Sequence, residues 1–163
     1  MRRLSLLLIV LSLLSAGCWT DGPVGFVPGG AFGDELETGP EPDWSFAVDL
    51  DSVGVQIDSS PPRTVRTGIV VLDGVPHLPV TYAFLKRWDA VVAESPRVVL
   101  RADGRHFERH AVLVTDEANH QALIAAGQAK YGAPFHGSWT SGMTDYFRLD
   151  PPQAAIPEAP ASK

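Results

Sequence analysis

Residues 97–114 read RVVLRADGRHFERHAVLV, and this stretch indicates the fold of the chain. At its centre stands Asp103-Gly104, a dipeptide that is typical of a two-residue β-hairpin turn. The residues on either side include several valines, which favour strands. We therefore expect antiparallel strands at 98–102 and 105–114, joined by a tight turn.

A second hairpin precedes the first one in the chain. Residues 63–81 read RTVRTGIVVLDGVPHLPVT, and Asp73-Gly74 separates a β-branched run at 64–72 from its expected partner at 75–80. Proline has no N–H to donate to a ladder, so Pro76 and Pro79 predict that this partner strand is short or lies at an edge.

The remaining elements follow from their periodicity. Apolar residues alternate over 53–57, which predicts another strand, and a last strand is expected at 146–149. Helical spacing appears at 81–94 and at 117–131, where Asp116 can cap the helix and Gly132 can end it. The fold class is therefore mainly β with helices (α+β). We expect a small closed or half-open antiparallel barrel with two helices packed outside it.

Composition divides the chain into four parts. Residues 18–43 are rich in glycine and proline without periodicity, which predicts a flexible tether, and residues 151–163 form a Pro/Ala-rich tail. The folded domain is expected at 44–150, after a signal peptide at 1–17. The formal net charge of −6 disfavours nucleic acid as a partner, and a single cysteine excludes an internal disulfide.

The first residues, MRRLSLLLIVLSLLSAGC, have the layout of a secretory signal: two arginines, an apolar run and a small-residue cleavage region. The stretch 14–18 (LSAGC) resembles a bacterial lipobox, which implies that Cys18 is lipidated and anchors the exported chain to a membrane. Trp19 rather than aspartate follows the cysteine, which favours the periplasmic face of the outer membrane in a Gram-negative host. The alternative is a plain signal peptide with a coincidental cysteine.

The succession SPRVVLR at 95–101, the hairpin after it and YFRLD at 146–150 resembles the split-barrel flavin-binding superfamily. That superfamily includes pyridoxamine 5'-phosphate oxidase-like and deazaflavin-dependent nitroreductase-like proteins. The resemblance covers about 46–150. It implies a homodimer that binds FMN or a deazaflavin, and an oxidoreductase acting on a small-molecule substrate. The positions that match the cofactor's phosphate site are Arg66, Thr67, Thr81, Lys86 and Arg87.

Three alternatives stay open at the level of the sequence. The basic cluster formed by Arg63, Arg66, Lys86 and Arg87 can be an anion pocket or ordinary surface salt bridging. The barrel can also serve a non-enzymatic envelope lipoprotein that binds a ligand or a protein without a cofactor. His106, Glu108 and His110 share one strand face, which suits either a metal or solvent, and we expect no metal there.

Overall fold

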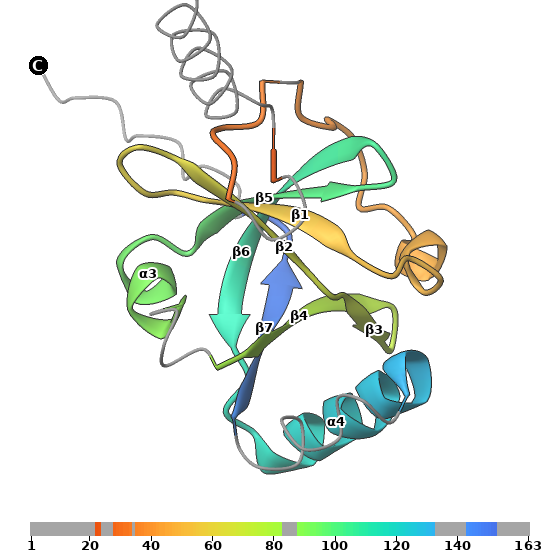
Figure 1. Ribbon diagram of the computed structural model, residues 1–163. Helices are drawn as coiled ribbons and strands as arrows, with labels where there is room; N and C mark the ends of the chain where they lie inside the picture. The colour runs from red at the N-terminus through yellow and green to blue at the C-terminus, as the bar shows by residue number, and fades with distance from the viewer. Residues whose placement is uncertain (1–21, 24–27, 34, 83–87, 133–142, 153–163) are drawn as a thin grey trace, which may run out of the picture.

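The computed structural model describes residues 22–23, 28–33, 35–82, 88–132 and 143–152. These residues form an antiparallel sheet of seven strands with two α-helices, which confirms the predicted α+β class (Figure 1). In chain order the elements are the 3-10 helix η2 (Trp44–Ala47), β1 (Val53–Ile57), β2 (Arg63–Thr67), β3 (Val70–Leu72), β4 (Val75–Thr81), α3 (Trp88–Glu94), β5 (Arg97–Ala102), β6 (Arg105–Leu113), α4 (Glu117–Tyr131) and β7 (Thr144–Asp150).

The sheet has the strand order β2-β1-β5-β6-β7-β4-β3, so its two outermost strands follow each other directly in the chain. The prediction of one continuous strand over 64–72 is wrong, because that run breaks at Gly68 and Ile69 into β2 and β3. The two halves of the run become the two ends of the sheet. The sheet must therefore curl round on itself to bring its ends together, which produces the barrel.

The barrel closes where β2 meets β4. The Thr67 hydroxyl donates to the carbonyl oxygen of Pro79 at 2.9 Å. A side chain at Gly68 would come within 3.0 Å of the Tyr131 hydroxyl oxygen and 3.3 Å of the Pro79 ring. Glycine therefore suits the break, because the helix and the neighbouring strand leave little room for a Cβ.

Both hairpin turns are confirmed. Asp73 and Gly74 have φ of 52° and 76°, and Asp103 and Gly104 have φ of 52° and 72°. Two successive residues with positive φ characterise the turn whose twist matches that of paired antiparallel strands. The Asp-Gly sequence therefore specifies the local geometry that sets the register of β5 and β6, in which Ala102 pairs with Arg105.

Strand β4 differs from its prediction, because it is seven residues long and pairs with strands on both sides. In an antiparallel strand the N–H and C=O of one residue point to the same neighbour. The Pro79 carbonyl accepts from Thr67 on the β2 side, so its missing N–H does not interrupt the ladder to β7. The pairing of β4 with β7 begins at His77, one residue after Pro76. The missing N–H of Pro76 therefore removes no hydrogen bond from that pairing.

Apolar side chains from alternate strand positions fill the barrel interior. The core includes Val55, Leu78, Leu100 and Phe147, all fully buried, and Trp44 of η2 closes one end against Phe107, 5.0 Å away between ring centroids. Burying each large side chain contributes about 1.5–3 kcal/mol. Because side chains pack the interior, candidate ligand sites lie on the outer faces and at strand ends.

Helix α4 packs against β3 (Figure 1), and its buried side chains also reach Tyr146 of β7. It begins and ends as the sequence predicts: the Asp116 carboxylate accepts from the Asn119 N–H, and Gly132 ends the helix at a φ of 73°. Leu123 and Ile124 pack against Val70 and Tyr146. None of the helices among the described residues is long and apolar enough to cross a membrane.

Part of the predicted tether contacts the barrel. Gly29 and Thr64 exchange two backbone hydrogen bonds of 3.0 and 3.1 Å, which occupy the outer edge of β2. Farther along, the carboxylate of Glu41 accepts from Arg109 at 2.8 Å and from the Trp44 indole N–H at 2.7 Å. An exposed strand edge offers unpaired N–H and C=O groups, which explains why a segment without periodicity attaches there.

Candidate cofactor site at the end of strand β4

Two of the predicted cofactor-binding residues, Thr67 and Thr81, lie near the same strand end. Thr67 ends β2, and its hydroxyl donates to the backbone of Pro79. Thr81 is the last residue of β4 and lies two residues after Pro79. Its hydroxyl oxygen accepts a hydrogen bond from the Thr144 hydroxyl at 3.3 Å. A hydroxyl that accepts one bond keeps its own hydrogen for another acceptor. Thr81 can therefore donate to an anion at this strand end.

The backbone turns sharply directly after Thr81. Tyr82 has a φ of 57°, which is uncommon for a bulky residue, and its N–H donates to the Met143 carbonyl oxygen at 2.6 Å. The Tyr82 side chain is 41% exposed. Residues held in this conformation cost free energy and cluster at ligand sites. Tyr82 is therefore an additional candidate residue, and no pattern in the sequence signals a left-handed tyrosine.

Arg66 does not join this group. Successive side chains of a strand point to opposite faces, and Arg66 lies on the face of β2 opposite to Thr67. Its Nε donates to the Ser52 hydroxyl at 2.6 Å, and the side chain is exposed. The structure thus brings together Thr67 and Thr81 of the predicted set and places Arg66 elsewhere.

The other predicted site residues, Lys86 and Arg87, lie outside the described residues, as does the predicted lipidation site Cys18. Helix α3 is described from Trp88 onward, so the predicted helix at 81–94 is confirmed only for its second half. The contribution of Lys86 and Arg87 to the site stays a prediction.

Behind the strand end lie two rings from α4 and β7. The Nε2 atom of His120 is 3.2 Å from the Thr144 carbonyl oxygen, and the His120 ring meets the Tyr146 ring edge-on at 5.4 Å. Burial raises the pKa of Tyr146, so its hydroxyl stays protonated at neutral pH. Tyr146 therefore brings no charge to the site. The positive charge that would attract an anion must come from other residues.

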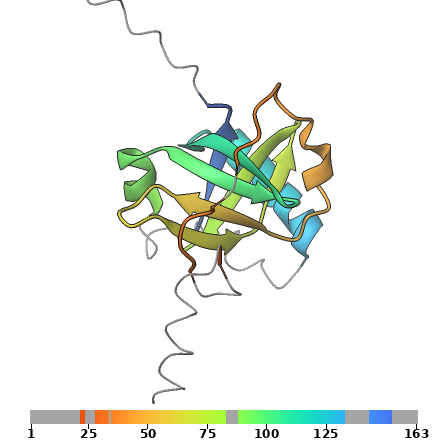
Figure 2. The ribbon, with the colours of Figure 1, turned by 90° about the horizontal axis from the view of Figure 1, so that it is seen from above.

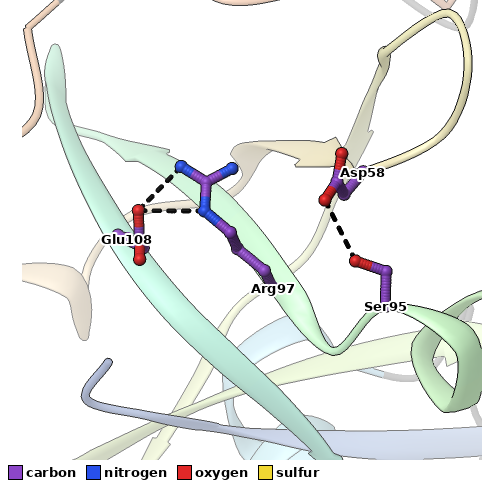
Figure 3. Close-up of polar contacts among 4 residues, drawn as sticks. All are labelled: Asp58, Ser95, Arg97 and Glu108. Atoms are coloured by element: carbon purple, nitrogen blue, oxygen red, sulfur yellow. Dashed lines mark hydrogen bonds and ion pairs between the residues drawn. The ribbon is translucent and has the colours of Figure 1, made fainter. Parts of the chain in front are cut away.

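Of the row formed by His106, Glu108 and His110 on β6, the first two side chains make other contacts. Glu108 accepts from Arg97 Nη2 at 2.7 Å and Nε at 3.0 Å, and Figure 3 shows this pair beside the hydrogen bond from Ser95 to Asp58. His106 is buried, with its ring 5.0 Å from that of Phe32. Within the described ranges, no three His, Cys, Asp or Glu side chains are grouped as metal ligands would be.

Strand order, barrel closure and outer helices together define an antiparallel split barrel of the pyridoxamine 5'-phosphate oxidase-like type. No protein-family model and no curated protein sequence matches the chain. Solved structures do match it, which places the chain in this fold class.

Among them is the heme storage protein HutZ from Vibrio cholerae, 17% identical, with a TM-score of 0.52 over 67% of this chain and 87% of that one. A candidate pyridoxamine 5'-phosphate oxidase from Listeria innocua is 14% identical, with a TM-score of 0.51 over 67% of this chain and 90% of that one. A third match, described as a domain-swapped dimer, is 15% identical, with a TM-score of 0.50 over 63% and 81%. At these identities the likeness concerns the fold.

Proposed function

We propose that the chain is a membrane-anchored lipoprotein whose split barrel binds a flavin-type cofactor, FMN or a deazaflavin, and acts as an oxidoreductase on a small organic molecule. The observation that carries this proposal is the end of β4, where the Thr81 hydroxyl and the strained Tyr82 lie side by side on a barrel of the appropriate fold class. The lipid on Cys18 would hold the exported domain at a membrane surface, on the periplasmic face of the outer membrane in a Gram-negative host.

The residues at this strand end fit the phosphate of such a cofactor. Hydroxyl and basic groups are the donors that phosphate prefers, and Thr81 is followed five residues later by Lys86 and Arg87. Tyr82, which follows Thr81 directly in the chain, offers an exposed ring. The cofactor would supply hydride or electron transfer, while the chain binds and orients it. A homodimer, as in the domain-swapped neighbour, is compatible with this proposal.

One observation favours the alternative, a barrel that binds a protein or ligand without a cofactor. Val112 and Leu113 at the end of β6 are 40% and 39% exposed. They line a pocket of about 370 Å³ together with Leu72 and Val75 of the β3–β4 hairpin. Exposed apolar groups that lie together mark interaction sites more often than isolated ones do.

Titration of the full chain in detergent with FMN and with a deazaflavin tests the proposal. We expect Lys86→Ala and Thr81→Val each to weaken binding by about tenfold, because each removes a donor to the phosphate. Arg63→Ala is the matched control, since Arg63 is an exposed basic residue of β2 that lies outside the site. Equal binding by all four chains would contradict the assigned site.

A further inference from the structure

The Phe32 ring, which belongs to the N-terminal segment (residues 28–43), lies on the outer face of β1 and β5. The Phe32 ring lies directly over Gly54, where a Cβ would meet the ring at 3.0 Å. In Figure 2 the segment, coloured red to orange, runs across these strands. Glycine in the middle of a strand weakens it, and it commonly marks the close approach of another group. Gly54 is thus the floor of a slot that Phe32 occupies.

The walls of this slot are basic. The ladders place Arg66, Gly54, Arg101 and His106 in one row across four adjacent strands, β2, β1, β5 and β6. The Arg101 guanidinium lies 4.6 Å from the centre of the Phe32 ring, and the His106 ring lies 5.0 Å from it. Partners in a ladder share a face, so three basic side chains surround a floor without a side chain.

Polar groups lie under the segment as well. Thr64 is completely buried beneath Gly29, and its hydroxyl oxygen has no hydrogen-bond partner among the described residues. The Gln56 amide oxygen accepts from the Phe32 N–H at 2.6 Å. A buried hydroxyl without a partner costs free energy, and a face built only to pack a phenylalanine would carry apolar residues instead. The face is therefore better suited to a polar ligand than to its present cover.

Hydrogen bonds between described residues tie this part of the segment to the sheet, in addition to the packing of the Phe32 ring. They include the two bonds between Gly29 and Thr64, the bond to Gln56, and one from the Glu37 N–H to the His106 carbonyl oxygen at 2.7 Å. A Cβ added at Gly30 would meet no atom within 4 Å. Segments with few buried apolar contacts open at low free-energy cost, so the cover can leave while the sheet stays folded.

We propose that the slot over Gly54 is a binding site for a planar aromatic anion, and that Phe32 is an internal plug which the ligand displaces. A ligand ring would stack on Arg101 as Phe32 does. The acidic group of the ligand would form ion pairs with Arg66 and Arg101. The uncharged Phe32 side chain cannot form such pairs. The ligand can bind only those molecules in which the slot is open. The plug therefore lowers the apparent affinity in proportion to that open fraction. This site is separate from the one at the end of β4.

Fluorescence anisotropy with naphthalene-2,6-disulfonate tests the slot in the full chain held in nonionic micelles, since a dianion stays out of the micelle. We expect Phe32→Ala to bind the probe at least about tenfold more tightly than the parent chain. Adding Gly54→Val or Arg101→Gln to Phe32→Ala should abolish that gain. Leu36→Ala, a substitution in the same segment away from the slot, should bind like the parent.

A second measurement on the parent chain covers the case in which Phe32→Ala fails to fold. Saturating probe should speed hydrogen exchange at the amides of Phe32 and Glu37, which the closed segment protects. Unchanged affinity in Phe32→Ala, or unchanged exchange in the parent, would overturn the proposal. Lys86→Ala should leave probe binding unchanged, so the outcome here is distinguishable from failure of the cofactor site.

Discussion

His77 shows how one buried side chain can link the fold to pH. It lies on β4, almost fully buried, with Nδ1 at 2.9 Å from the Val75 carbonyl oxygen. Burial lowers the pKa of His77 below 6.5, and the positive charge of Arg148 adds to this, whereas Val75, Asp150 and Asp73 oppose it. The folded chain therefore resists protonation at this residue.

This environment gives a prediction for the free energy of unfolding. The unfolded chain takes up a proton at His77 near pH 6.5, before the folded chain does, so stability is full above that pH and is lost as pH falls through the lower, folded-state pKa. Between about pH 8 and about pH 5, we expect the melting temperature of His77→Gln to fall by less than that of the parent chain. Identical losses in both chains would show that His77 does not contribute.

Tyr131 and Lys130 show how one helix end fixes the break in the sheet. The Tyr131 hydroxyl accepts from the Ile69 N–H and donates to the Ile69 carbonyl oxygen, both at 2.8 Å, and Lys130 Nζ donates to the same carbonyl at 2.9 Å. Ile69 is fully buried and belongs to neither β2 nor β3. The last turn of α4 thus supplies the hydrogen bonds that the interrupted strand lacks.

Removal of the Tyr131 hydroxyl should therefore destabilise the barrel. Tyr131→Phe leaves the buried Ile69 N–H without its partner, and we expect a loss of about 1–3 kcal/mol in urea unfolding. Gln121→Ala is the control on the same helix, because the exposed Gln121 bonds only to the Glu117 side chain, and its loss should stay within about 0.5 kcal/mol. A loss of unfolding free energy in Tyr131→Phe that is no larger than the loss in Gln121→Ala would contradict this role of the Tyr131 hydroxyl.

Local patterns predict most elements, and the order of those elements predicts a barrel, but they do not predict where the barrel closes. The hairpins at Asp73-Gly74 and Asp103-Gly104 and the capped helix α4 are readable because each depends on residues close together in the sequence. The break at Gly68 depends on Tyr131 and Pro79, which no pattern connects to it. The burial of Pro79 in a central strand likewise depends on Thr67 lying beside it.

At the scale of the molecule, the candidate site was only partly predictable. Thr67 and Thr81 are candidates through a family resemblance, whereas the candidacy of Tyr82 depends on a backbone conformation that its identity disfavours. Within the predicted tether, Gly29 and Phe32 form hydrogen bonds to the barrel. Glycine and proline without periodicity predict a linker, and only a tertiary partner can order such a segment.

The proposed membrane attachment concerns the whole chain and would rest on Cys18. We expect the parent chain to sediment with membranes and Cys18→Ser to move to the soluble fraction, because acyl chains rather than a described helix would provide the hold. Intact mass should show the mature chain beginning at a fatty-acylated Cys18. A Cys18→Ser chain that stays with the membranes would contradict lipid anchoring.

The visible absorbance spectrum of the purified full chain during titration with FMN and a deazaflavin is the most direct measurement of the proposed function. Binding at the end of β4 predicts a shifted ring spectrum that saturates with added cofactor and is weakened in Lys86→Ala. Spectra that remain those of the free compounds at every protein concentration, with no bound ring compound detected by mass spectrometry, would contradict a flavin-binding barrel.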